Sequence, residues 1–425
     1  MTDTPTDAAT ETTATIPAKH ANLAIFALSI GGFAIGTGEF VSMGLLPNIA
    51  GGIDVSIPTA GHVVSAYAVG VMVGAPLIAA FTAKWPRRKL LTALMAVFAI
   101  GNIASALAPG YDSLLAARFL AGLPHGAFFG IGAVVGASLV PANKRAWAFS
   151  MMMAGLTVAN VVGVPLTTLI GQQWGWRWPY SLVGVLGLLT LAALLFWMPE
   201  RAAEAHATMR TELSALKQKQ VWLALLTGTV GFGGMFATYS YITPTMTTLA
   251  HFSETAVTAL LAVYGIGMTV GVIIGGRLAD RALMPSLYVS LLITAAVLFA
   301  FGWAVQQGKA AAVVAIFIFG ITGSLLVPML QTRLMDVAKD GQSLAAALNH
   351  STLNLANALG ALIGGFVLDR GLGYTWPSRV GGFLALAGLA VALISGWLDR
   401  FQVDQPSLDR ITASPHEPIP AVDAR

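Results

Sequence analysis

Residues 65–77 read SAYAVGVMVGAPL, and a shift of 197 residues aligns them with AVYGIGMTVGVII at 262–274. Neither stretch contains a charged side chain, and both continue into apolar sequence long enough to cross a bilayer, which takes about 20 residues of helix. The identical residues in this alignment include Tyr67 with Tyr264, Gly70 with Gly267 and Gly74 with Gly271. We therefore expect a membrane protein made of two related halves.

The same register holds for other pairs of apolar stretches. The further matches are Lys84 with Arg281, Pro47 with Pro244, Gly126 with Gly323, 158–160 with 355–357, Gly163 with Gly360 and, one residue later in register, 178–179 with 376–377. A register shared by four pairs of helices is difficult to obtain by chance, even in a chain with 46 glycines. Parallel repeats of this kind are typical of transporters, which place the substrate between the halves near the bilayer midplane.

Composition supports this interpretation. Hydrophobic residues make up 56% of the 425 residues and charged residues only 10%, whereas a soluble domain has about 25% charged residues. The absence of cysteine excludes disulfides and thiolate metal sites. The net charge of +4 comes from basic residues in short loops, which is a topology signal and does not indicate nucleic-acid binding.

The sequence predicts an all-α membrane protein with twelve transmembrane helices in two parallel-repeat bundles of six. The expected spans are 21–46, 59–82, 89–108, 112–139, 146–170, 179–198, 221–248, 256–279, 285–305, 311–334, 343–368 and 379–398. The expected divisions are a disordered cytoplasmic tail at 1–20, bundles at 21–198 and 221–400, a cytoplasmic linker at 199–220 and a cytoplasmic tail at 401–425 that is disordered from about Gln405.

The distribution of basic residues sets the orientation. With both termini inside, the cytoplasmic segments and helix ends hold 18 of the 23 lysines and arginines. Because cytoplasmic loops are enriched in these residues, we expect both termini on the cytoplasmic side of a bacterial inner membrane.

The motifs resemble the major facilitator superfamily, and within it the twelve-span drug:proton antiporter group, over about residues 20–400. They are most similar to bacterial arabinose-efflux-permease-like inner-membrane transporters. The resemblance rests on TGEFVSMGLLPNIA at 37–50, SAYAVGVMVGAPL at 65–77, ARFLAGLPHGAFFG at 117–130, ANVVGVPLTTLIG at 159–171 and GGRLADR at 275–281. Two positions depart from the family pattern: Ala83 replaces the acid of the loop between spans two and three, and Thr167-Thr168 replace paired glycines in span five.

Glu39 is the one carboxylate well inside an expected span. An ionisable group at the bilayer centre costs about 2.5–3.5 kcal/mol on insertion scales, so it is a functional candidate. Burial favours the neutral acid and a nearby cation favours the carboxylate, and a proton carrier needs this competition. The alternative is an inert, hydrogen-bonded group near the external interface.

Arg118 is the expected partner of Glu39, because both lie about 10–12 Å below the outer edge at 1.5 Å per residue. The resemblance also implies that spans one and four are neighbours and that Arg118 matches the family's span-four arginine. A structural arginine bonded to backbone carbonyls is the alternative. His125 follows two turns later on the same face and is either a substrate or proton contact or a packing residue.

Other residues are expected to line a substrate cavity or a gate. Aromatic and methionine side chains suit amphiphilic ligands, although such residues also pack membrane helices. The cavity residues that we expect, besides His125, are Phe40, Met43, Phe129, Tyr239, Asn354 and Asn357. Asp280 and Arg281, with Arg87 and Arg88, are expected to form a cytoplasmic gate.

These observations predict a monomeric, proton-coupled transporter that exports a small sugar-like or drug-like solute by alternating access. It is expected to be no enzyme. No G-x-x-x-x-G-K-[ST] motif is present, so ATP-driven transport by this chain alone is not expected, and no H-E-x-x-H motif suggests an intramembrane protease. We expect no cofactor and no metal; the expected partners are the solute, protons and the lipid bilayer. An uncoupled uniporter or importer, or a sensor without turnover, are the alternatives.

Overall fold

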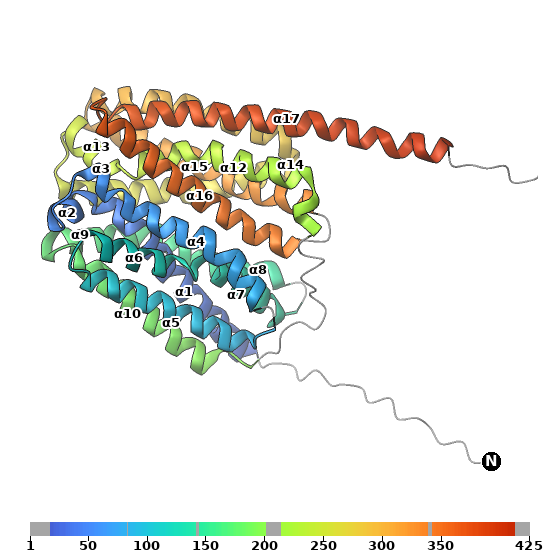
Figure 1. The fold of residues 1–425 in the computed structure, drawn as a ribbon, viewed down its shortest axis with the longest axis horizontal. Helices are drawn as coiled ribbons and strands as arrows, with labels where there is room; N and C mark the ends of the chain where they lie inside the picture. Colours follow the sequence, from blue (N-terminus) through green and yellow to red (C-terminus); the bar gives the residue numbers. More distant parts are fainter. Residues whose placement is uncertain (1–17, 83, 142–143, 201–213, 339–341, 413–425) are drawn as a thin grey trace, which may run out of the picture.

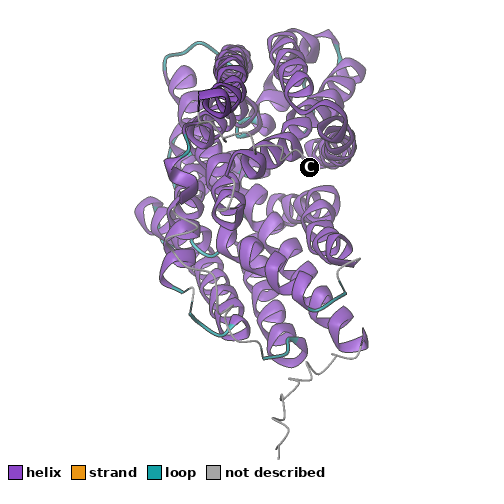
Figure 2. Cartoon of the chain, turned by 90° about the vertical axis from the view of Figure 1, so that its right-hand side faces the viewer, coloured by secondary structure: helices purple, strands orange, loops and turns teal. Residues whose placement is uncertain are grey.

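A computed structural model of the chain describes residues 18–82, 84–141, 144–200, 214–338 and 342–412. Helices and short connections account for all of these residues, and the described part contains no strand (Figure 2). The first half contains α1 (Ala18–Gly44), α2 (Leu46–Gly52), α3 (Ile57–Ala60), α4 (His62–Phe81), α5 (Arg87–Leu107), α6 (Tyr111–Gly122), α7 (His125–Ser138), α8 (Arg145–Val158), η2 (Ala159–Gly163), α9 (Val164–Trp174) and α10 (Arg177–Trp197). The second half contains η3 (Ser214–Lys217), α12 (Lys219–Tyr239), α13 (Ile242–Leu249), α14 (Glu254–Ala304), η4 (Val305–Gln307), α15 (Lys309–Ala338), α16 (Gln342–Asp369) and α17 (Trp376–Thr412).

Eleven helical segments of the described chain are long and apolar enough to cross a membrane. One of them, Glu254–Gln307, contains 54 residues, about twice the length that a bilayer needs. Its backbone leaves the helical region at Ala282 (φ −160°, ψ 81°), three residues before Pro285. The segment therefore forms two legs, which agrees with the twelve spans that the sequence predicts.

Breaks inside the spans lie at specific residues. Span four is interrupted at Leu123 and Pro124, so that His125 begins a new helix. Span five contains the π-helix η2 directly before Pro165. Proline has no N–H to donate and its ring disturbs the preceding turn, which explains why the regular ladder of hydrogen bonds is interrupted at these places.

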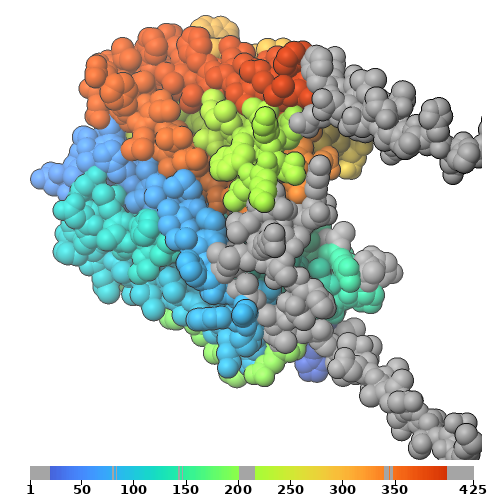
Figure 3. Space-filling view, turned by 45° about the vertical axis from the view of Figure 1, so that its right-hand side comes forward, coloured from blue at the N-terminus to red at the C-terminus, as the bar shows by residue number. Residues whose placement is uncertain are grey.

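The helices form two groups, with α1 to α10 in one and α12 to α17 in the other (Figure 1). We call the end that holds residues 18, 82 and 198 the terminus side, and the end that holds α2, α3 and α13 the opposite side. The groups meet where α4 contacts α16 and where the first leg of α14 contacts η2 and α9. The space-filling view shows α16 in orange directly against α4 in blue (Figure 3).

Glycines allow the helices of each half to approach closely, and they reveal the register of the repeat. A Cβ at Gly122 would meet the carbonyl of Tyr67, and a Cβ at Gly320 would meet the carbonyl of Tyr264. Since Tyr67 and Tyr264 are equivalent, Gly122 corresponds to Gly320, a shift of 198 residues.

This shift corrects the match between Gly126 and Gly323, because in span four the equivalent of Gly126 is Ser324. The equivalent of Arg118 is Ile316, which is fully buried. The second half carries one more residue between its second and fourth spans, and an uninterrupted alignment cannot show an insertion of this kind.

The C-terminal end also differs from expectation. Disorder was expected from about Gln405, but α17 runs without a break to Thr412. The last span ends in a stretch without glycine, so nothing there favours the left-handed turn that commonly ends a helix. Residues 201–213 of the expected linker, residues 1–17 of the expected N-terminal tail and residues 413–425 of the C-terminal tail lie outside the described residues.

Candidate functional site

Arg118 lies at the centre of the first half and is fully buried. Its Nη2 donates a hydrogen bond to the carbonyl of Gly38 at 2.9 Å, and Nη1 contacts Oδ1 of Asn102 at 3.5 Å. The guanidinium carbon lies 4.3 Å from the ring centroid of Tyr67 and 5.2 Å from that of Tyr180. A carbonyl, an amide and two aromatic faces thus compensate a cation that has lost its hydration.

Glu39 directly follows Gly38, whose carbonyl Arg118 binds, and Glu39 is only 7% exposed. Within the described residues, its carboxyl group makes no hydrogen bond and no ion pair, and this includes Arg118. The charge of Arg118 nevertheless acts on it, and Glu39 in turn lies within electrostatic reach of Tyr67, Tyr239 and Tyr264. The site therefore holds an acid without a fixed partner beside a cation that is fixed.

A chain of contacts leads from Arg118 to the second half. Tyr67, which covers the guanidinium, shares a hydrogen bond of 3.2 Å between its hydroxyl and Nδ1 of His125. The ring of His125 lies 6.2 Å from that of His350, and Phe129 stacks on His350 at 5.5 Å. His125 and His350 come from different halves, so any relative movement of the halves changes their contact.

The expected cavity residues form two groups. Phe40, Met43 and Tyr239 belong to one cluster of buried apolar side chains from both halves, in which Phe40 meets Tyr239 at 5.8 Å and Tyr239 stacks on Tyr264 at 4.2 Å. His125 and Phe129 form the other group with His350. Both groups lie at the boundary between the halves, where a transporter of this architecture places its substrate.

Asn354 and Asn357 are both buried on α16. The Nδ2 of Asn354 donates to the carbonyl of His350, but its Oδ1 has no partner, and neither amide atom of Asn357 has one. Asn160, the counterpart of Asn357 in the repeat, also leaves its Oδ1 without a partner. Buried polar atoms without partners are costly, so these amides are suited to a ligand or to water.

The expected gate residues lie on the terminus side but do not form a clasp in this structure. Asp280 and Arg281 are exposed, and neither forms an ion pair with another described residue. Arg88 binds the carbonyl of Leu195 and lies 3.9 Å from Glu200, so its contacts stay within the first half. Arg87 is half-buried, and Ala83 lies outside the described residues.

Two features of the structure were not expected from the sequence. Tyr67 links Arg118 to His125, and its repetition as Tyr264 is the signal that could have identified it. Arg333 is buried on the terminus side, where its Nη2 lies 2.6 Å from Oδ2 of Asp399 and 3.1 Å from both Gln220 and Ser395. Its position at the end of an expected span could have identified it as a buried charge.

A model of the Major Facilitator Superfamily matches residues 28–343 of this chain. The chain belongs to the major facilitator superfamily. It is therefore a membrane transporter, and the twelve spans in two groups are the architecture that its sequence motifs implied.

Curated relatives cover nearly the whole transporter. "Inner membrane transport protein YdhP" of Escherichia coli K12 is 43% identical over 88% of this chain and 95% of that protein. "Chloramphenicol resistance protein" of Streptomyces lividans is 32% identical over 87% of this chain and 94% of that protein. "Probable sugar efflux transporter" of Helicobacter pylori is 32% identical over 87% and 94%. Each is a protein that this transporter resembles.

Proposed function

We propose that this transporter exports a small organic solute, sugar-like or drug-like, in exchange for protons. The observation that carries the proposal is Glu39, a buried carboxyl group without a hydrogen bond or an ion pair in the described part of the chain. A carboxylate with a fixed partner would gain little from a proton. Glu39 has only the field of Arg118 to stabilise its charge, so a proton can bind and leave as the environment changes.

The contacts between the halves support alternating access. Ser65 donates to the carbonyl of Ala358 at 3.1 Å, and Thr243 donates to that of Gly44 at 3.0 Å. Gln172 donates to the carbonyl of Glu254 at 2.9 Å. All three bonds lie toward the opposite side, which they hold closed. They connect neutral groups, so no buried charge has to be exposed when they break.

The solute class follows from the relatives and from the boundary between the halves. Two relatives are named for chloramphenicol resistance and for sugar efflux. The aromatic rings of Phe40 and Tyr239 suit a solute with an apolar face. The amide atoms of Asn354 and Asn357 that have no partner suit hydrogen-bonding groups on the same solute. We propose that Phe40, Met43, His125, Phe129, Tyr239 and these asparagines contact it.

Topology and assembly complete the proposal. We propose a monomer in the bacterial inner membrane, with the terminus side in the cytoplasm, bundles at 21–198 and 221–400 and a cytoplasmic linker at 199–220. In this orientation Glu39 takes up a proton from outside and releases it inside, aided by the membrane potential of about 2.3 kcal/mol per charge per 100 mV. No covalent chemistry is required of any residue.

The test uses purified protein in liposomes that contain a pH-sensitive dye, with chloramphenicol and a panel of monosaccharides as probes. We expect one of these probes to accumulate on the acidic side when a pH gradient is imposed, and its movement to carry protons the other way. Glu39→Gln removes the titrating proton and should abolish this uphill movement, while downhill exchange partly survives.

The matched control is Glu200→Gln, because that side chain is 82% exposed. It should transport like the unmodified protein. Full uphill efflux by Glu39→Gln would show that Glu39 is not the proton carrier. Accumulation on the alkaline side would indicate an importer, and the absence of any uphill movement would indicate a uniporter.

A further inference from the structure

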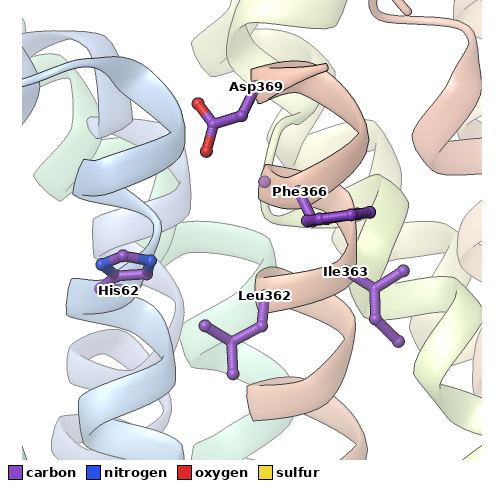
Figure 4. A pocket seen from close by; sticks show the side chains of 6 residues that line it. His62, Leu362, Ile363, Phe366 and Asp369 are labelled. Carbon is purple, nitrogen blue, oxygen red and sulfur yellow. The ribbon is translucent and has the colours of Figure 1, made fainter.

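A cavity of about 390 Å³ lies between α4 and α16 on the opposite side, away from the site around Glu39. Its lining residues are His62, Leu362, Ile363, Gly365, Phe366 and Asp369. Asp369 points from α16 across the gap toward α4, where His62 lies, and Leu362 points the same way below it (Figure 4). The cavity therefore has a polar upper end and an apolar lower part, and it is formed jointly by the two halves.

Two residues of opposite charge follow each other in sequence at the polar end. Asp369 is the last residue of α16 and Arg370 follows it, and both are exposed. Neither forms an ion pair with another described residue. The guanidinium of Arg370 instead lies 4.6 Å from the ring centroid of Phe366, which lines the cavity. A carboxylate and a guanidinium that are adjacent but unpaired are complementary to a ligand that carries both an ammonium group and a phosphate.

The end of α16 and the ring of His62 reinforce this pattern. α16 ends at Asp369, and the negative end of its dipole favours a cation there. His62 is not at a free helix N-terminus, because α3 continues through the helical Gly61 into α4. Nδ1 of His62 shares a hydrogen bond of 2.6 Å with the hydroxyl of Tyr111, which fixes the ring and leaves Nε2 available to a ligand.

Below the charges, an apolar path follows the two helices. Leu359, Leu362 and Phe366 are exposed on one face of α16. On α4, four apolar residues three or four positions apart lie on one face. They are Ala66, Val69 and Val73, which are partly exposed, and Leu77, which is exposed. These faces belong to segments that are long and apolar enough to cross a membrane, so we expect them to meet lipid chains rather than water.

We propose that this cavity binds a bilayer phospholipid with a primary ammonium headgroup. Asp369 binds the ammonium group, Arg370 binds the phosphate, and one acyl chain lies along Leu362 and Phe366. Nε2 of His62 on α4 binds the same headgroup, so the lipid contacts both halves on the side that is closed here and stabilises that closed state. The site requires only that the transporter lies in a bilayer, so it does not depend on proton coupling or on the solute.

The experiment places the full-length protein in nanodiscs with equal amounts of phosphatidylethanolamine and phosphatidylglycerol, and native mass spectrometry measures which lipid is retained. We expect about tenfold preferential retention of phosphatidylethanolamine, which corresponds to about 1.4 kcal/mol. Asp369→Asn should abolish the preference. Asp112→Asn, an exposed acid on the same side outside the cavity, should keep it. Leu362→Trp, which fills the apolar part, should lower retention without changing the charge.

Equal retention of the two lipids by the unmodified protein would overturn the proposal, and so would an unchanged preference in Asp369→Asn. If glycerophosphoethanolamine, which has no acyl chains, displaced the lipid at equal concentration, the groove would have no role and the proposed lipid site would be wrong. None of these outcomes bears on Glu39→Gln, whose effect on uphill transport is measured separately.

Discussion

At the scale of single residues, the pair of charges in the first half is asymmetric. Arg118 has a carbonyl and two aromatic faces as partners, whereas Glu39 has no bonded partner among the described residues. A buried cation that lacked partners would be unstable, so the fold fixes Arg118. We propose that the acid beside it, which has no fixed partner, is the group that changes its protonation.

Replacement of Arg118 by lysine tests how this cation is held. Lysine keeps the charge but lacks the planar group that stacks on Tyr67 and Tyr180. We expect Arg118→Lys to lose uphill transport and to lower the free energy of unfolding by about 1–2 kcal/mol, measured by thermal unfolding in detergent. Arg379→Lys changes an exposed arginine near Trp376 and should leave both properties unchanged. Full activity of Arg118→Lys would show that only the charge matters.

At the scale of the helices, close approach in the two halves depends on equivalent glycines. Gly74 lies against the carbonyl of Leu123 in the first half, and Gly271 lies against that of Ile321 in the second. The contacts join span two to span four and span eight to span ten. Small residues at such positions are what lets membrane helices pack backbone to backbone.

An added methyl group at either glycine should therefore separate the helices. We expect Gly74→Ala and Gly271→Ala each to lower the free energy of unfolding by about 1–3 kcal/mol. Gly130→Ala is the matched control, because a Cβ there meets nothing within 4 Å. Thermal unfolding monitored by tryptophan fluorescence measures all three variants. Equal stability of Gly74→Ala and Gly130→Ala would contradict the packing role of Gly74.

At the scale of the whole molecule, hydrogen bonds join the two halves on the opposite side. On the terminus side, Asp280 is exposed and forms no ion pair with a described residue. We hypothesise that Asp280 forms its clasp only when the terminus side closes. Ala83 stands at the equivalent position of the first half, so that half supplies no second acid.

Accessibility of an introduced cysteine tests the clasp, because the chain has no cysteine of its own. With a single cysteine at Leu353, Asp280→Asn should increase labelling from the terminus side about 2- to 5-fold, as expected for the loss of an exposed ion pair worth about 0.5–1 kcal/mol. Asp336→Asn, an exposed acid on the same side, is the control. An unchanged rate in Asp280→Asn would mean that this acid is merely interfacial.

Topology is tested in the same background. An impermeant maleimide added to intact cells should label a cysteine at Lys309, on the opposite side, and should not label one at Glu200. After the cells are made permeable, both positions should react. The skew of basic residues toward the terminus side is the physical reason. Labelling at Glu200 in intact cells would contradict the proposed orientation.

The sequence by itself determined the spans, the repeat and the positions of Glu39 and Arg118 inside spans. These features depend on local properties: an apolar stretch satisfies its own backbone hydrogen bonds only as a helix in the bilayer, and an ionisable residue inside such a stretch is conspicuous. The motifs around Glu39 and Arg118 were sufficient to predict the family, and the family match confirmed it.

Only the tertiary structure decided which side chains meet. Arg118 contacts Asn102 and Tyr180, and His125 meets His350, across separations of 16, 62 and 225 residues. Two further features depend on how distant helices pack. One is the one-residue insertion that makes Ile316 the equivalent of Arg118, and the other is the cavity lined by His62 and Asp369. Such contacts are set by the mutual fit of several helices, and no single stretch of sequence contains that information.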